Sequence, residues 1–303
     1  MIAVFWLFVY LIHIAVLPLL FIGLVRWLKA RLQGRQGPSL YQPFWDFAKM
    51  LGKGETISET ATGAFRIAPL ASLASVATVS LMIPWAGVPS PIAGDLVLAV
   101  YLLAAGKFCT SLAALDTGSS FGAIGASREA AISIQAEPAL LLGLGALAVH
   151  AHDSRFAAFL TPSGGEHIVI LAVLAGAAAW MCAMAELSRM PIDDPTTHLE
   201  LTMVHEAMIL ENSGRNLALI EYTVALKTTL LLGLVVQIVL LAVPLRSIAV
   251  HYIVSILLLA ATAAGLAISE TVMVKLSWRR VPNMLSYAIG ASALACLLVA
   301  MRG

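Results

Sequence analysis

The segment ELSRMPIDDPTTHLELTMVHEAMILENSGRNLALIEY, Glu186–Tyr222, interrupts a chain that otherwise consists largely of apolar runs. Its 37 residues hold seven of the chain's 17 acidic side chains, namely Glu186, Asp193, Asp194, Glu200, Glu206, Glu211 and Glu221. Apolar runs stand on both sides, at about residues 167–186 and 223–244. An acidic insert between two hydrophobic spans predicts a long polar loop at one face of a membrane.

The composition excludes a water-soluble domain. Hydrophobic residues make up 60% of the chain, charged residues 12%, and the mean hydropathy is +0.92, whereas soluble domains average about 25% charged residues. Because only helices satisfy their own backbone groups over apolar runs of roughly 20 residues, we predict an all-α polytopic protein with one integral membrane domain, residues 1–303. Eight spans are expected, at about residues 2–27, 67–86, 94–115, 131–150, 167–186, 223–244, 248–272 and 283–301.

Lysine and arginine are distributed unevenly between the predicted loops. They gather in the loops at about residues 28–66, 116–130, 187–222 and 273–282, whereas the opposite side has only Arg155, Arg246 and Arg302. By the positive-inside rule the basic loops face the cytoplasm, so both chain termini are expected on the non-cytoplasmic side. The first apolar run is too long for a signal peptide and lacks a positive start, so we expect a retained helix.

The cysteines give no indication of a metal centre. Cys109, Cys182 and Cys296 lie far apart in apolar segments, and no CxxC or Cys/His cluster is present in the sequence. We therefore expect no iron–sulfur cluster, no zinc and no other cofactor in this chain. The net charge of +1 gives no reason to expect nucleic acid as a partner.

The first loop contains GRQGPSLYQPFWDFAKMLGKGE, Gly34–Glu55. After Pro43 the apolar residues recur at near-helical spacing, with Asp46, Lys49 and Lys53 elsewhere on the turn, which predicts an amphipathic helix at the membrane surface. Such a helix serves as an interfacial anchor, as a docking surface for a soluble partner, or as both.

Two ionisable residues stand within apolar runs. Lys107 lies deep in AVYLLAAGKFCTSLAAL, where a cation usually faces a bundle interior or a water-filled cavity; the alternative is a snorkelling or structurally paired lysine. Asp116 is a possible partner for it, although a bend would be needed. Glu137 shares a helix face with Ser133 and precedes Pro138, which suggests a hydrated helix break. We favour a place in a proton path for Glu137 over a static ion pair.

The acidic segment itself predicts a helix that begins at Thr196 or Thr197. On that helix Glu200 and Glu211 share one face, and Glu206 points elsewhere. A solvated surface helix is the simplest interpretation, but its remaining faces are too apolar for free exposure to water. Packing would partly desolvate the carboxylates and raise their pKa, which suits proton carriers. Glu270 is expected to pair with Lys275, and His13 and His251 are expected to be hydrogen-bonded rather than ligands.

Three stretches in this order resemble one family: GRQGPSLYQPFWDFAKMLGKGE, SREAAISIQAEP and AELSRMPIDDPTTHLEL. They are similar to the proximal membrane subunit of respiratory complex I and of membrane-bound nickel–iron hydrogenases. The residues that match the family's motifs are Arg35, Gly37, Pro38, Gln42, Pro43, Asp46, Lys49, Arg128, Glu137, Glu186, Arg189, Pro191, Asp193 and Glu200, with looser matches at Glu211 and Glu221. The resemblance implies a subunit at the junction of a cytoplasmic redox arm and an antiporter-like membrane arm.

The chain departs from the quinone-using members of that family. Those members carry a run of acids after the first Asp, of which only Glu200 remains here, and His198 stands in an acid's place. Ser188 replaces an asparagine. The sequence is closer to the formate hydrogenlyase and hydrogenase-4 branch, which implies a hydrogenase-like large subunit, an iron–sulfur small subunit and antiporter-like membrane subunits as partners. Iron–sulfur clusters and a nickel–iron centre would reside in those partners, and the location would be a bacterial or archaeal cytoplasmic membrane.

The sequence therefore predicts a non-catalytic subunit that anchors the redox arm and relays protons. The expected proton path comprises Lys107, Glu137, Glu186, Glu200, Glu206, Glu211 and Glu221. The expected contacts with the redox arm are Arg35, Asp46, Lys49, Arg128, Arg189, Asp193 and His198. Three alternatives remain open: a quinone-chamber subunit of a respiratory NADH dehydrogenase, a stand-alone secondary transporter, and a purely structural anchor.

Overall fold

The structure is a computed structural model that describes residues 2–85, 88–162, 166–193, 203–243, 245 and 247–301, with side chains described from residue 7 onward. The helices are α1 (Ile2–Leu32), α2 (Gln42–Leu51), α3 (Gly63–Met82), α4 (Leu96–Asp116), α5 (Ser120–His150), α6 (Phe156–Phe159), α7 (Glu166–Glu186), α8 (His205–Ile209), α9 (Gly214–Leu240), α10 (Ile248–Val272), the 3₁₀ turn η1 (Trp278–Arg280) and α11 (Val281–Ala300). Within the described ranges no strand forms beyond two isolated bridges. The all-α prediction is confirmed.

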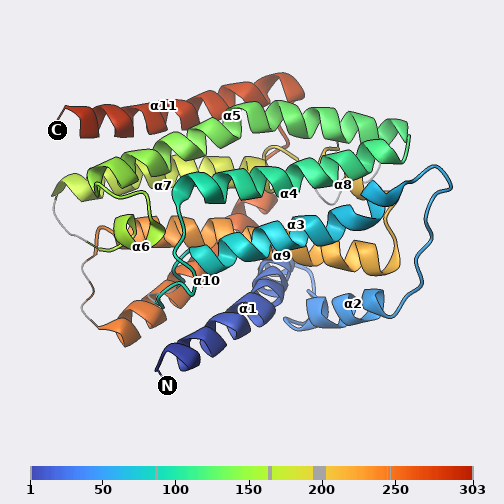
Figure 1. The fold of residues 1–303 in the computed structure, drawn as a ribbon, viewed down its shortest axis with the longest axis horizontal. Coiled ribbons are helices and arrows are strands. Elements are labelled where there is room, and N and C mark those ends of the chain that lie inside the picture. Colours follow the sequence, from blue (N-terminus) through green and yellow to red (C-terminus); the bar gives the residue numbers. More distant parts are fainter. Residues whose placement is uncertain are drawn as a thin grey trace.

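Eight helices of the described chain are long and apolar enough to cross a membrane: α1, α3, α4, α5, α7, α9, α10 and the helix that ends the chain, α11 with η1. Their number and positions confirm the predicted spans. Both chain ends lie toward one end of the bundle, opposite the end that carries α2 and α8 (Figure 1). This arrangement agrees with the prediction that the termini share a side, and the side that faces the cytoplasm stays a prediction.

The bundle is built around α9, which packs against α1, α2, α3, α7 and α10 and is the most buried of the spans. A second group, α5, α7 and α11, packs through small side chains. A Cβ placed on Gly143 of α5 would come within 3.0 Å of Ser292 Oγ on α11. Small residues let helix backbones approach closely, which strengthens dispersion contacts where lipid supplies no hydrophobic driving force.

Two spans begin earlier than the apolar pattern predicts. α5 starts at Ser120 rather than near residue 131, and α9 starts at Gly214 rather than near residue 223. Hydropathy detects only the apolar part of a helix, whereas backbone hydrogen bonding continues through polar turns beyond it. The predicted loop at 116–130 is therefore mostly helix. The expected break at Pro138 is also wrong, because α5 continues through that residue.

The predicted helix from Thr196 to Glu211 is wrong in the part that the structure describes. Met203 and Val204 are not helical, and α8 has only five residues. The physical reason is a competing long-range contact, since Val204 N donates to Asp193 Oδ2 at 2.8 Å. Asp194, His198 and Glu200 lie outside the described residues.

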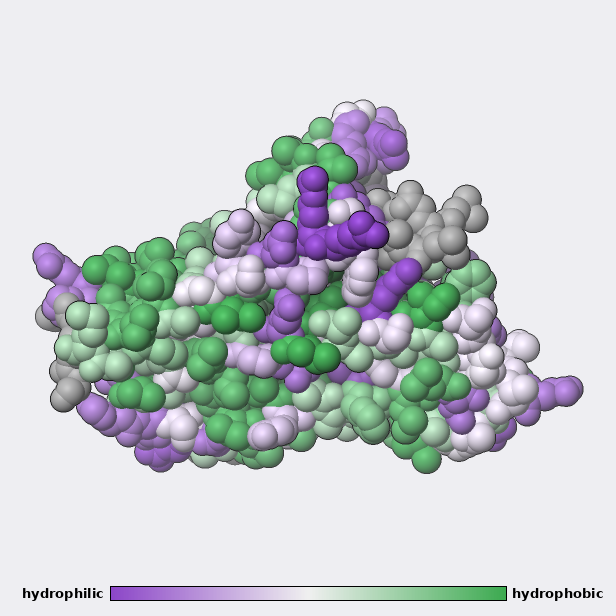
Figure 2. All heavy atoms as spheres, turned by 90° about the horizontal axis from the view of Figure 1, so that it is seen from above, coloured by the Kyte–Doolittle hydropathy of each residue, from purple (hydrophilic) through white to green (hydrophobic). Residues whose placement is uncertain are grey.

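The amphipathic helix of the first loop is confirmed as α2. Phe47 packs its ring 5.2 Å from that of Tyr222 on α9, while the Trp45 side chain is 71% exposed. Figure 2 shows apolar residues along one face of the molecule and hydrophilic ones gathered toward its two ends and on the part that projects at the top of the view. Helices with so many exposed apolar side chains suit a lipid environment.

Candidate functional site

Lys107, near the middle of α4, is the residue on which the site converges. Its Nζ lies 2.6 Å from Glu186 Oε1, 2.9 Å from Glu137 Oε1 and 3.9 Å from Glu129 Oε1, and it donates to Ser133 Oγ at 2.6 Å. A buried ammonium ion is tolerated only when carboxylates and other acceptors replace its hydration shell. Lys107 therefore faces a polar interior and is paired there with carboxylates, and a part for it in proton transfer stays a prediction.

Glu186, the last residue of α7, joins this lysine to a second one. Its Oε2 lies 2.9 Å from the Nζ of Lys227 on α9, and its backbone carbonyl accepts from the same Nζ at 3.0 Å. The Glu186 side chain is 4% exposed. Lys107, Glu129, Glu137, Glu186 and Lys227, which we call the central charge cluster, thus come from α4, α5, α7 and α9.

The face of α5 explains how one helix supplies three of the contacts with Lys107. Glu129, Ser133 and Glu137 follow one another at four-residue intervals, which places them on one side of a helix. The predicted shared face of Ser133 and Glu137 is confirmed. Asp116 is not the partner of Lys107; it accepts from the backbone N of Thr62 at 2.7 Å and of Phe65 at 3.2 Å. Asp116 therefore caps α3, since the nine-residue offset turns it away from the lysine.

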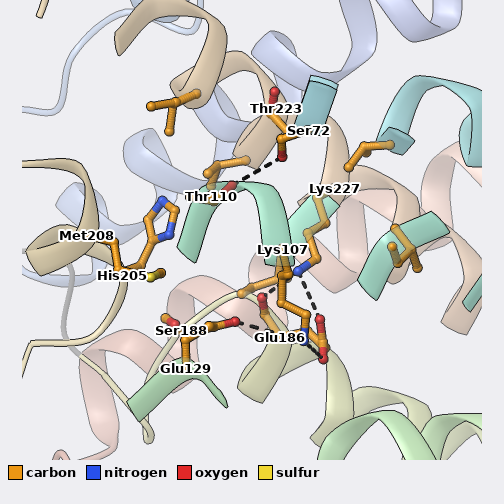
Figure 3. A pocket seen from close by; sticks show the side chains of 15 residues that line it. Ser72, Lys107, Thr110, Glu129, Glu186, Ser188, His205, Met208, Thr223 and Lys227 are labelled. Carbon is orange, nitrogen blue, oxygen red and sulfur yellow. Dashed lines mark hydrogen bonds and ion pairs between the residues drawn. The ribbon is translucent and has the colours of Figure 1, made fainter. Parts of the chain in front are cut away.

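An inner cavity of about 60 Å³ adjoins the central charge cluster (Figure 3). Glu129, Glu186, Lys107 and Lys227 form one part of its wall, and His205 and Met208 form another. A polar cavity of this size holds roughly two to four water molecules. Glu129 Oε2 is buried and has no hydrogen-bond partner among the residues described, so it presents a free acceptor.

A larger cavity of about 550 Å³, the loop-side cavity, lies between α1, the first loop and the segment after α7. Its charged lining residues are Arg26, Lys29, Arg35, Arg189, Asp193, Glu206, Glu221 and Glu270. It shares Leu187, Ser188, His205 and Val224 with the inner cavity. A third pocket of about 350 Å³ continues toward α2 and shares Arg26, Arg189 and Glu221 with it. The cavities therefore run in series from the bundle centre to the end that carries α2.

Fixed ion pairs line the loop-side cavity. Glu270 Oε2 lies 3.0 Å from Lys29 Nζ, and its Oε1 lies 3.0 Å from Arg189 Nη1. Asp193 Oδ1 lies 2.7 Å from Lys275 Nζ. The expected Glu270–Lys275 pair is wrong, because the chain after α10 leads Lys275 across to the acidic segment instead.

His205 begins α8 and stands between the inner and loop-side cavities. Burial together with the charges of Lys227 and Arg189 lowers the pKa of His205 from 6.5 to about 4, although Asp193 acts in the opposite direction. The imidazole is therefore neutral at pH 7. Its Nε2 is buried and has no hydrogen-bond partner within the described part of the chain.

The family model described as NADH dehydrogenase matches residues 5–301. The chain belongs to this family. It is 34% identical over 221 residues to hydrogenase-4 component C of Escherichia coli (strain K12), covering 72% of this chain and 69% of the relative. It is 33% identical over 236 residues to formate hydrogenlyase subunit 4 of the same organism, covering 75% and 74%.

The fold is shared with a solved chain from the membrane-bound sulfane sulfur reductase, an archaeal respiratory membrane complex. The TM-score is 0.82 at 19% identity, and the match covers 99% of this chain and 100% of that one. The family match and the two relatives confirm the resemblance drawn from the three sequence motifs, including its hydrogenase branch.

Within this family member, the predicted proton-path residues fall into three groups. Lys107, Glu137 and Glu186 lie in the central charge cluster. Glu206 and Glu221 line the loop-side cavity. Glu211, in contrast, is exposed after the end of α8, because the chain turns there instead of continuing as a helix.

The predicted contacts with a redox arm are also dispersed. Arg35 lines the loop-side cavity, and Asp46 and Lys49 line the pocket beside α2. Arg128 donates to Met203 O at 3.0 Å and lies over the Trp278 ring. Arg189 and Asp193 line the loop-side cavity, and their side chains are only 15% and 2% exposed. Their ion pairs hold the acidic segment in place. An effect of either residue on a partner would therefore pass through that segment.

Sequence reasoning missed Glu129 and Lys227 as members of the cluster. The apolar run begins near residue 223 and puts Lys227 close to the edge of a predicted span, whereas α9 begins at Gly214 and carries the lysine in its middle. The four-residue spacing from Glu129 through Ser133 to Glu137 was the available signal for Glu129. No group of three or more His, Cys, Asp or Glu side chains among the described residues has the geometry of a metal site.

Proposed function

We propose that this chain is the membrane-anchoring and proton-coupling subunit at the junction of a cytoplasmic, hydrogenase-like redox arm and an antiporter-like membrane arm. The central charge cluster carries the proposal. Five ionisable side chains are costly inside a membrane bundle and serve best where protons or ions move. Family membership and the two hydrogenase-type relatives support the same assignment.

Protons would reach the cluster from the redox arm through the two outer cavities. The loop-side cavity and the pocket beside α2 are lined by charged side chains and lie at the end of the bundle that holds the longest loops. The exposed Trp45 on α2 offers an apolar anchor for a docked protein or for the lipid interface. A hydrogenase-like large subunit and an iron–sulfur small subunit would sit over this end and carry the iron–sulfur clusters and the nickel–iron centre.

Protons would leave the cluster through a groove between α4 and α5. The groove holds about 790 Å³ and has Lys107, Glu129, Ser133 and Glu137 at its floor. The walls are apolar and include Tyr101, Phe108 and Ile134, which are 71%, 67% and 74% exposed. The Glu137 side chain is 30% exposed. A carboxylate that faces hydrocarbon is unfavourable, so an antiporter-like membrane subunit with a polar group in its docking helix fits this groove.

The geometry of Glu186 suggests how redox events would affect the cluster. One carboxylate holds two ammonium groups, Lys107 at 2.6 Å and Lys227 at 2.9 Å. Protonation of Glu186 would weaken both contacts at once and leave the lysines attracted to Glu129 and Glu137 instead. A change of charge in the loop-side cavity would thus be passed toward the α4–α5 groove.

The test is Glu137→Gln in the assembled complex, reconstituted in liposomes with redox turnover and proton movement measured together. Glutamine keeps the shape and a hydrogen-bond acceptor for Lys107 but cannot carry a proton. We expect assembly and redox turnover to persist while coupled proton movement falls at least tenfold. Glu166→Gln, at the exposed start of α7, is the matched control. Full proton movement in the Glu137 variant would remove this residue from the path.

A further inference from the structure

His205 lines both the inner cavity and the loop-side cavity. Among the described residues, it shares this position with Leu187, Ser188 and Val224. It is the one ionisable side chain of that shared set. The position is fixed by close packing against α5, since a Cβ on Gly125 would come within 2.8 Å of Val204 O and 2.9 Å of Met208 Cγ. The segment that carries His205 therefore rests directly on the helix that carries Glu129.

The surroundings of His205 are charged on both sides. Toward the inner cavity stand Lys107, Glu129, Glu186 and Lys227, and toward the loop-side cavity stand Arg189, Asp193, Glu206, Glu221, Glu270, Lys29, Arg26 and Arg35. Buried polar atoms are normally hydrogen-bonded, yet Nε2 has no partner among the described residues. An apolar side chain would fill the same place without that cost, so the imidazole needs a reason to be there.

A neutral imidazole has one ring nitrogen that accepts a proton and one that donates. We propose that His205 transfers protons between the loop-side cavity and the inner cavity, an inference that rests on the function proposed above. A proton added to one nitrogen from a water or carboxyl group in the loop-side cavity gives an imidazolium. Loss of the proton on the other nitrogen, toward water in the inner cavity, restores a neutral ring as the opposite tautomer, and reversal of the tautomer resets it.

The surroundings of His205 determine how readily its ring holds a proton. Burial above all, and then the charges of Lys227 and Arg189, disfavours the imidazolium and lowers the His205 pKa to about 4. The proton therefore does not rest on His205 but passes through it. Lys227 also contacts Glu186 at 2.9 Å, so proton transfer through His205 depends on the charge state of the central charge cluster.

The experiment uses the assembled complex in liposomes, with redox turnover and membrane potential recorded together. His205→Ala leaves space beside a cavity, so added imidazole can occupy it, whereas His205→Gln fills the space without proton exchange. We expect both variants to assemble and to generate at least tenfold less potential per electron transferred. Imidazole should restore potential in His205→Ala and leave His205→Gln unchanged. Membrane potential is the better readout because imidazole, as a weak base, dissipates pH gradients.

Ile209→Val is the matched control, because Ile209 lies on the same short helix, does not titrate and lines neither the inner nor the loop-side cavity; it should behave like the wild type. If the alanine variant does not assemble, loss of potential in assembled His205→Gln decides the question. Normal potential in either histidine variant, or a loss in His205→Ala that imidazole leaves unrepaired, would overturn the transfer role. A wild-type complex that turns over without generating any potential would overturn the proposed function itself.

Discussion

The shared carboxylate of Glu186 leads to a quantitative prediction for Glu186→Gln. Lys227 has Glu186 as its carboxylate contact, at 2.9 Å, whereas Lys107 also has Glu137 at 2.9 Å and Glu129 at 3.9 Å. The substitution therefore deprives Lys227 of its counterion and leaves Lys107 with two others. The resulting loss of stability should be greatest at the contact between α7 and α9.

The size of the loss follows from the distances. Unit charges 2.9 Å apart attract by about 6 kcal/mol at an effective dielectric constant of about 20. Most of this is offset by the desolvation of both groups. Removing one partner of a buried pair costs about 3–5 kcal/mol because the other charge stays buried. Glu186→Gln/Lys227→Met also removes the unpaired buried charge that causes most of this cost, so the double variant should recover at least half of the loss.

Cys182 provides the assay, because it lies one turn before Glu186 on α7 and is fully buried. Its reaction with a maleimide dye, in a chain with Cys109→Ser and Cys296→Ser, reports unfolding in a denaturant titration. Asp153→Asn, which breaks the exposed pair with Arg155, should leave the free energy of unfolding unchanged. Wild-type stability in Glu186→Gln, or a double variant less stable than the single one, would refute the pairing argument.

Two further predictions concern the acidic segment. Asp193→Asn should lower redox turnover of the complex several-fold, because the 2.7 Å ion pair with Lys275 is lost and the Val204 N contact weakens, so that the segment under the redox arm shifts; turnover equal to that of Asp153→Asn would argue against this. Acidification should destabilise the chain. Because the His205 pKa is lowered to about 4, the unfolded state binds more protons than the folded state between pH 6.5 and pH 4. The free energy of unfolding therefore falls as the pH drops through that window, on the order of 2 kcal/mol by pH 5. His205→Gln should lose correspondingly less between pH 7 and pH 5 in thermal unfolding followed by tryptophan fluorescence, and an equal loss would show that other groups dominate.

The sequence determined the fold class, the eight spans, the surface helix α2 and the family. Short stretches of sequence specify these features, since a run of apolar residues needs no other part of the chain to form a membrane helix. The motifs around Gly37, Arg128 and Pro191 likewise lie in short contiguous stretches. Lys107 and Glu137 also stood out, because a charge in an apolar run is visible without a structure.

The tertiary structure decided which charges meet. Lys107, Glu129, Glu186 and Lys227 are separated by up to 120 positions, and their contact depends on the packing of four helices that no local pattern encodes. The same packing assigned Asp116 to the start of α3, gave Glu270 partners other than Lys275, and kept Val204 out of the predicted helix through a hydrogen bond with Asp193. Apolar burial specifies where a helix lies in the membrane, but a charge buried among helices takes whichever counterion the packing brings within reach.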